Sequence, residues 1–245
     1  MKKYAAFIVW IIIIFVSCNP GYAHADSQDS GDGLFEDYTI NQNNKNVPDP
    51  VYWFNYGMYQ FNDKLYFWLI KPVTKGYRAV VAREIRHGIK NFFYNLLFPV
   101  RFINSLLQGK FAGAGTELKI FLINSSAGCL GFAQPAQNDF GLKNSDEDLG
   151  QTLGSYAMGE GFYLVLPVLG PSTLRDFIGD VGDFFLKPVN YIEPDEAAVG
   201  AYAFDKINKT SFTLGDYKEL KDSALDPYIA IKNAYIQLRR EKTEK

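Results

Sequence analysis

The segment GQTLGSYAMGEGFYLVLPVLGPSTLRD, residues 150–176, carries the strongest indication of fold in this chain. Its centre, residues 162–169, contains no charged side chain and is too short to span a bilayer. Pro167 lies inside this apolar stretch, which glycine and proline residues flank. Because proline removes a backbone donor and glycine weakens regular elements, the pattern predicts an irregular, tightly packed apolar wall. Such a wall suits a cavity that contacts lipid.

Two groups of candidate site residues lie in this segment. The lipid-path candidates follow one another through the apolar centre: Phe162, Tyr163, Leu164, Val165, Leu166 and Pro167. The gate candidates are glycines that we predict to require positive φ or close backbone approach: Gly150, Gly154, Gly159 and Gly161. An ordinary loop would also explain the glycines, and a packed core would also explain the apolar run.

The amino terminus has the layout of a secretory signal peptide. Lys2 and Lys3 precede an uncharged stretch, residues 4–16, that is shorter than the roughly twenty residues of a transmembrane helix. We therefore predict that the mature protein is exported. Two processing sites remain open: a lipobox-like sequence that ends at Ser17 and would make Cys18 a lipidation site, and a conventional cleavage site after Ala25.

Composition limits the classes of function. Removal of residues 1–25 changes the net charge from -2 to -4, because two lysines and no acid are lost. An acidic chain lacks the basic face of a nucleic-acid-binding protein. Aromatic residues make up 16% of the sequence, and aromatic side chains with a polar tip favour boundaries between apolar and wet surroundings.

Cysteine and histidine usage argues against several chemistries. Beyond the signal region the chain has one cysteine, Cys129, which we expect to be buried, and one histidine, His87, on a predicted helix. No disulfide framework, zinc motif, nucleophile elbow or dinucleotide loop is recognisable. The acidic residues 146–148 lack EF-hand spacing and indicate a solvated turn or the start of a helix. We therefore expect no enzyme activity, no metal site and no cofactor.

A mainly α domain is predicted for residues 49–245, after a flexible polar tether at 26–48. Asp49 is expected to cap the first helix, and proline and glycine break the chain into many short-to-medium helices. The expected helices are 51–70, 72–82, 85–108 with an interruption at Pro99, 116–129, 173–186, 196–208 and 227–242.

The first of these helices, residues 51–70, is apolar on nearly every face. Spacings of three and four place one stripe on it: Val51, Phe54, Met58, Phe61, Leu65 and Trp68. A helix of this kind is either buried or in contact with lipid. Trp53, Tyr56 and Trp68 are candidates for the membrane interface, where tryptophan and tyrosine are enriched.

Together, many short motifs resemble the VacJ/MlaA family of Gram-negative outer-membrane lipoproteins. The motifs span residues 49–240 and include Asp49-Pro50, Phe54-Asn55, Tyr59-Gln60-Phe61-Asn62-Asp63, Arg86-His87-Gly88-Ile89-Lys90-Asn91-Phe92-Phe93, Phe121-Leu122-Ile123-Asn124-Ser125, Gly150-Gln151-Thr152-Leu153-Gly154, Gly159-Glu160-Gly161-Phe162-Tyr163, Leu169-Gly170-Pro171-Ser172, Leu174-Arg175-Asp176 and Asp226-Pro227-Tyr228. Two features depart from the family: Phe15 replaces the usual leucine before Cys18, and the carboxyl-terminal tail is short.

The resemblance implies a helical, ring-like protein with a central amphipathic channel, held at the periplasmic face of the cell outer membrane. It also implies retrograde transport: mislocalised phospholipid leaves the outer leaflet and passes to a periplasmic lipid-carrier protein, which maintains lipid asymmetry. A trimeric porin is an implied partner. Two rival functions have different requirements. A lipid hydrolase would need a nucleophile and base that the sequence does not show, whereas a structural or adhesive envelope protein would carry no phospholipid.

Overall fold

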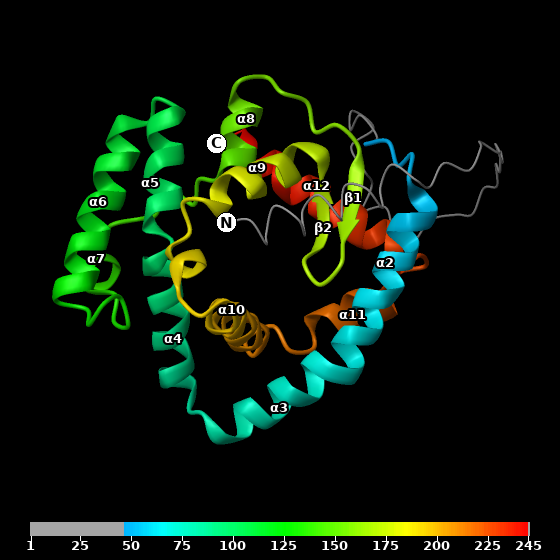
Figure 1. Cartoon of the computed structure of the whole chain (residues 1–245), viewed down its shortest axis with the longest axis horizontal. Helices are drawn as coiled ribbons and strands as arrows, with labels where there is room; N and C mark the ends of the chain where they lie inside the picture. Colours follow the sequence, from blue (N-terminus) through cyan, green and yellow to red (C-terminus); the bar gives the residue numbers. More distant parts are fainter. Residues whose placement is uncertain (1–46, 245) are drawn as a thin grey trace. The chain divides into compact units, whose positions relative to one another are not determined.

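Proline residues begin several helices of the computed structural model, which describes residues 47–244 (Figure 1). Pro99 and Pro227 each lie in the first turn of a helix, where the missing N–H leaves no intrahelical bond unmade. Pro72 instead follows η2 within continuous helical backbone. The elements are α2 (Tyr52–Leu65), the π-helical η2 (Tyr66–Ile70), α3 (Lys71–Val80), α4 (Arg83–Leu96), α5 (Phe98–Leu107), α6 (Phe111–Ser126), α7 (Pro135–Asn138), α8 (Leu149–Ser155), β1 (Tyr163–Leu166), β2 (Gly170–Thr173), α9 (Leu174–Phe184), η3 (Pro188–Tyr191), α10 (Asp195–Thr210), α11 (Asp216–Ser223) and α12 (Pro227–Thr243).

Every long helix expected from the sequence is present, and the mainly α fold class is confirmed. The sequence patterns missed α7, α8 and α11, which are only four, seven and eight residues long. Helix α6 begins earlier than predicted, because Gly113 and Gly115 remain helical despite their low propensity. Asp148 caps α8 by accepting a hydrogen bond from the Gln151 amide, so the acidic cluster does precede a helix. Asp49 does not cap α2, whose N-cap is Val51 with no side-chain bond.

The apolar centre at residues 162–169 forms one strand of a β-hairpin, so our prediction of an irregular wall is wrong. Strand β1 pairs antiparallel with β2, and Tyr163 lies opposite Thr173 while Leu166 lies opposite Gly170. Pro167 lies in the turn and Gly170, with φ +99°, at its end, whereas Gly159 and Gly161 precede β1 and Pro171 lies in β2. Strands of four residues are too short for alternation to be visible in the sequence.

Burial on α2 is inverted relative to a water-soluble helix. The buried residues of α2 are Asn55, Tyr59 and Asp63, whereas Trp53 is 79% exposed and Phe61 is 47% exposed. The apolar stripe predicted from spacing therefore faces outward in large part, with Trp68 of η2 78% exposed at its end. Among residues 47–244, no helix is both long and apolar enough to cross a membrane.

Charged and polar side chains hold the interior together. Arg101 donates to Glu117 at 2.8 Å between α5 and α6, and Asn104 donates to Asp183 at 2.8 Å between α5 and α9. Arg239 of α12 donates to Asp148 at 2.6 Å and to Asp176 at 2.8 Å, which joins α12 to α8 and α9. Buried ions of this kind are stable only when paired and hydrogen-bonded.

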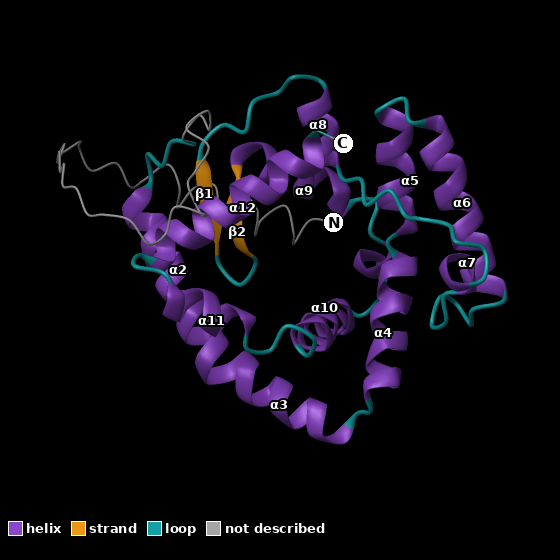
Figure 2. Cartoon of the chain, turned by 180° about the vertical axis from the view of Figure 1, so that it is seen from behind, coloured by secondary structure: helices purple, strands orange, loops and turns teal. Residues whose placement is uncertain are grey.

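The described residues belong to one compact unit of the chain. Several of its helices follow one another along an arc. In Figures 1 and 2, α2, α3 and α4 succeed each other on its outer side, and α10 lies inside the arc in contact with α3 and α4. The β-hairpin packs against α2, and β2 also contacts α12. The central channel that the resemblance implies stays a prediction.

Candidate functional site

Two asparagines on one face of α2 bind the backbone of the hairpin. Asn55 donates to the Tyr163 carbonyl at 2.9 Å and accepts from the Val165 amide at 2.8 Å. Asn62, two helical turns later, donates to the Leu166 carbonyl at 2.9 Å and accepts from the Val168 amide at 2.7 Å. Each carboxamide supplies a donor and an acceptor, as a neighbouring strand would. Helix α2 therefore satisfies the open edge of β1.

Aromatic side chains pack behind these asparagines. Tyr228 of α12 contacts the rings of Tyr59 and Tyr163 with centroid distances of 5.8 Å and 6.1 Å. Asp49, rather than capping α2, accepts hydrogen bonds from Asn55 and from the Tyr228 hydroxyl. Burial and the neighbouring Asp49 carboxylate both raise the pKa of Tyr228 well above 10, so this hydroxyl stays protonated. These hydrogen bonds and ring contacts thus join the hairpin to α2 and α12.

A cavity of about 180 Å³ lies between α2, η2, the hairpin, α10, α11 and α12. Its wall is largely aromatic and aliphatic, with a few polar groups: Tyr59, Asn62, Tyr66, Ile70, Tyr163, Val165, Val168, Leu169, Gly170, Pro171, Lys206, Tyr217 and Ile231. An apolar wall with few polar groups is typical of sites for small molecules and lipid parts. We call it the hairpin cavity.

The lipid-path candidates divide between the two faces of the hairpin. Tyr163 and Val165 line the hairpin cavity, as side chains two apart on a strand should. Leu164 is 4% exposed and does not line the cavity. Phe162 and Leu166 are half-buried and Pro167 is exposed in the turn; none of these three lines the cavity.

The four gate glycines also differ in their surroundings. A Cβ on Gly150 would lie 2.6 Å from Arg239 Nη2 and from Asp176 Oδ1, and one on Gly154 would lie 2.4 Å from Thr243 Cγ2. Gly161 has φ +73°. Close approach or positive φ therefore explains three of them. Gly159 shows neither feature, because nothing lies within 4 Å of its added Cβ and its φ is not positive.

We expect Gly150→Ala to lower the free energy of unfolding by about 1–3 kcal/mol, because the methyl group overlaps the buried Arg239–Asp176 pair. Gly159→Ala, the matched control in open space, should change it by less than about 0.5 kcal/mol. Chemical denaturation of both variants measures the difference. Equal stability of the two variants would contradict the role of Gly150 in packing.

The interface candidates Trp53 and Trp68 lie on the outer surface, at 79% and 78% exposure. Tyr56 is 36% exposed and stacks on Tyr52 with a centroid distance of 5.8 Å. Our expectation that Cys129 is buried is wrong: it is exposed, in a turn with φ +52°. The described residues do not include Cys18, either processing site, the signal peptide or residues 26–46 of the predicted tether.

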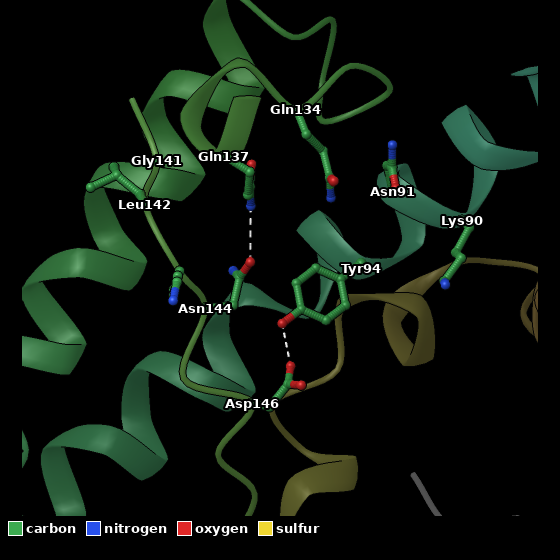
Figure 3. A pocket seen from close by; sticks show the side chains of 10 residues that line it. Lys90, Asn91, Tyr94, Gln134, Gln137, Gly141, Leu142, Asn144 and Asp146 are labelled. Carbon is green, nitrogen blue, oxygen red and sulfur yellow. Dashed lines mark hydrogen bonds between the residues drawn. The ribbon is translucent and has the colours of Figure 1, made fainter. Parts of the chain in front are cut away.

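A larger hollow of about 620 Å³ lies on another part of the surface (Figure 3). Most residues that line it have polar side chains, and four of these are carboxamides: Asn91, Gln134, Gln137 and Asn144. Tyr94 donates to Asp146, and Gln137 donates to Asn144 at 2.9 Å. Few aliphatic or aromatic side chains line this hollow, so it is a weaker candidate for a lipid site than the hairpin cavity.

Comparison with known proteins decides the family. The model of the family described as "MlaA lipoprotein" matches residues 47–242. The chain belongs to the MlaA lipoprotein family. It is 33% identical to the Escherichia coli "Intermembrane phospholipid transport system lipoprotein MlaA", over 77% of this chain and 76% of that protein. The Haemophilus influenzae protein of the same description is 30% identical, over 81% and 78% of the two chains.

The fold is also similar to a solved structure. A chain reported under "Structural basis for maintenance of bacterial outer membrane lipid asymmetry" aligns with TM-score 0.70 and 31% identity, covering 80% of this chain and 99% of that one. An uncharacterized Rickettsia conorii protein is 29% identical over 81% of this chain. The sequence did not predict roles for Asn62, Tyr66 or Lys206. Asn62 could have been found from its seven-residue spacing from Asn55, which puts both side chains on one face of a helix.

Proposed function

We propose that this chain is the outer-membrane component of a retrograde phospholipid transport system. It removes mislocalised phospholipid from the outer leaflet and passes it through an amphipathic path to a periplasmic lipid-carrier protein, so that the outer membrane stays asymmetric. The membership of the MlaA lipoprotein family and the description of its Escherichia coli relative support this function. A trimeric porin is a proposed partner at the same membrane.

The observation that carries the proposal is the inverted burial of α2 beside the hairpin cavity. A polar inner face bonded to β1 and an aromatic outer face suit a helix with lipid on its outside and protein on its inside. The buried Tyr163 and Val165 extend an apolar surface inward along one face of the strand. Lipid at the outer face therefore lies close to an apolar route into the protein.

Complementation tests the function. An Escherichia coli strain that lacks its own MlaA protein should regain a low phospholipid content in the outer leaflet when it expresses this chain. The control is the same chain with Asp at Val165 (Val165→Asp), which puts a carboxylate in the apolar cavity wall. Both proteins must reach the outer membrane in equal amounts. The contrary result is that neither protein restores asymmetry although both are present, and that the purified chain carries no phospholipid. That result would favour a structural or adhesive envelope protein.

Trp53 and Trp68 are expected to enter the membrane interface. They are the two tryptophans left after removal of the signal region, so the tryptophan fluorescence of the mature protein, excited selectively, reports on them alone. Phospholipid vesicles should shift the emission to shorter wavelength, and the double change Trp53→Ser/Trp68→Ser should weaken vesicle binding by about tenfold or more. Emission unchanged by vesicles would contradict the proposed interface.

Lipidation of Cys18 is proposed as the anchor of the domain. Several acyl groups on one cysteine give stable attachment, whereas a single chain binds only marginally. Mass spectrometry of the mature amino terminus should find an acylated Cys18. An unmodified chain that begins at Asp26 would refute lipidation and leave attachment to the aromatic face of α2.

A further inference from the structure

Lys206 lines the hairpin cavity from α10 and has no hydrogen-bond or ion-pair partner among the described residues. The neighbouring lysines differ from it. Lys209 is paired with Asp205 at 2.7 Å, and Lys221 is paired with Asp63 at 2.8 Å. Burial and, secondly, the charge of Lys209 lower the pKa of Lys206, whereas the Asp205 carboxylate acts in the opposite direction. Part of the Lys206 side chain is exposed, so a ligand can reach it from solvent.

The hydroxyl of Tyr66 is the second unsatisfied group of this cavity. It is buried and has no hydrogen-bond partner within residues 47–244. Tyr217 on the same wall differs, because its hydroxyl donates to Asp63 at 2.9 Å. Because a buried hydroxyl without a partner is unfavourable by about 1–3 kcal/mol, an oxygen acceptor from a ligand would satisfy it.

We propose that Lys206 and the Tyr66 hydroxyl bind the phosphate group of a phospholipid in the hairpin cavity. A phosphate diester has a negative charge for the ammonium group and oxygen acceptors for the hydroxyl. The first carbons of the acyl chains would contact Val165, Leu169 and Ile231 on the apolar wall. The cavity is too small for a whole phospholipid, so the chains extend beyond it. This proposal rests on the proposed transport function and names the part of the lipid that is recognised.

Binding of soluble short-chain lipids to the full mature protein tests the proposal. The probes are dihexanoyl phosphatidylglycerol, dihexanoylglycerol, which has no phosphate, and inorganic phosphate. Wild type should bind the phosphatidyl probe about tenfold or more tightly than dihexanoylglycerol, as a charge-assisted contact predicts. Inorganic phosphate should compete weakly, because it lacks the acyl contacts.

The variants separate phosphate recognition from general damage. Lys206→Met should weaken the affinity for the phosphatidyl probe by about tenfold or more and leave the affinity for dihexanoylglycerol unchanged. Lys206→Arg should retain the affinity for the phosphatidyl probe. Tyr66→Phe should weaken the affinity for the phosphatidyl probe by about three- to tenfold. The control is Lys119→Met, which removes the same charge from an exposed position on α6 that does not line the cavity. Thermal unfolding of each variant confirms that it is folded.

Each remaining outcome decides the matter. Equal affinity of wild type for the two lipid probes, or an equal effect of Lys206→Met on both, would overturn phosphate recognition and leave lipid transport standing. Binding of inorganic phosphate that depends on Lys206, without binding of the phosphatidyl probe, would assign the site to free phosphate and overturn the lipid proposal. Binding of no probe would refute both this proposal and the transport function on which it rests.

Discussion

Replacement of Asn55 with alanine is expected to lower the free energy of unfolding by about 3–5 kcal/mol, because several buried polar groups lose their partner at once. The carboxamide of Asn55 bonds to Asp49 Oδ1 at 2.7 Å, to the Tyr163 carbonyl and to the Val165 amide, and the residue itself is fully buried. Only Asn62 then still binds the edge of β1, at the Leu166 carbonyl, and the Tyr163 carbonyl and the Val165 amide lose their side-chain partner. The hairpin should therefore separate from α2 before the rest of the domain unfolds.

Denaturant unfolding and amide hydrogen exchange measure this effect. In Asn55→Ala the Val165 amide should exchange faster than in wild type, whereas amides within α5 should change little. The control is Asn91→Ala, which removes an exposed hydrogen bond of 3.3 Å to the Phe132 carbonyl. In Asn91→Ala the free energy of unfolding should fall by less than about 1 kcal/mol. A loss of similar size in both variants would contradict the anchoring role of Asn55.

Replacement of Arg239 with methionine is expected to lower the free energy of unfolding by about 3 kcal/mol near neutral pH. The change leaves Asp176, which is 4% exposed, and Asp148 without their shared cation. The control is Lys218→Met, which breaks an exposed pair with Asp222 and should change stability by less than about 0.5 kcal/mol.

The effect of Arg239→Met should depend on pH in a defined direction. Burial alone would raise the pKa of Asp148, but hydrogen bonds and charge from Arg239 lower it below its ordinary value. A lowered pKa contributes stability above the unfolded pKa of about 3.9, and this contribution is lost as pH falls through the folded value. The difference in free energy of unfolding between wild type and Arg239→Met should therefore shrink as pH falls below about 4. A difference that stays constant with pH would contradict this account of the pair.

The helices could be predicted from sequence because proline and capping residues act locally. Pro99 and Pro227 begin helices where fixed φ and a missing N–H require it. Periodicity also identified the apolar side of residues 51–70, but it could not show which side faces the protein. That choice depends on Asn55 and Asn62, whose partners lie more than a hundred residues away along the chain.

The hairpin and the cavity required the three-dimensional structure. The strands are too short for an alternating pattern, and the edge of β1 is satisfied by side chains of α2 rather than by a third strand of the described region. The juxtaposition of Tyr66 and Lys206 brings together η2 and α10, which no local pattern connects. In contrast, the family resemblance identified the chain correctly, because many weak motifs occur in one order along the domain.

The central claim is that phospholipid occupies the hairpin cavity, and site-specific photocrosslinking in cells tests it most directly. A photoreactive amino acid replaces Leu169, which lines the cavity, or Asp222, which lies on the exposed face of α11. Cells grown with radiolabelled phosphate should yield labelled phospholipid attached at position 169 and not at position 222. Absence of labelled phospholipid at position 169, or equal labelling at both positions, would contradict the account.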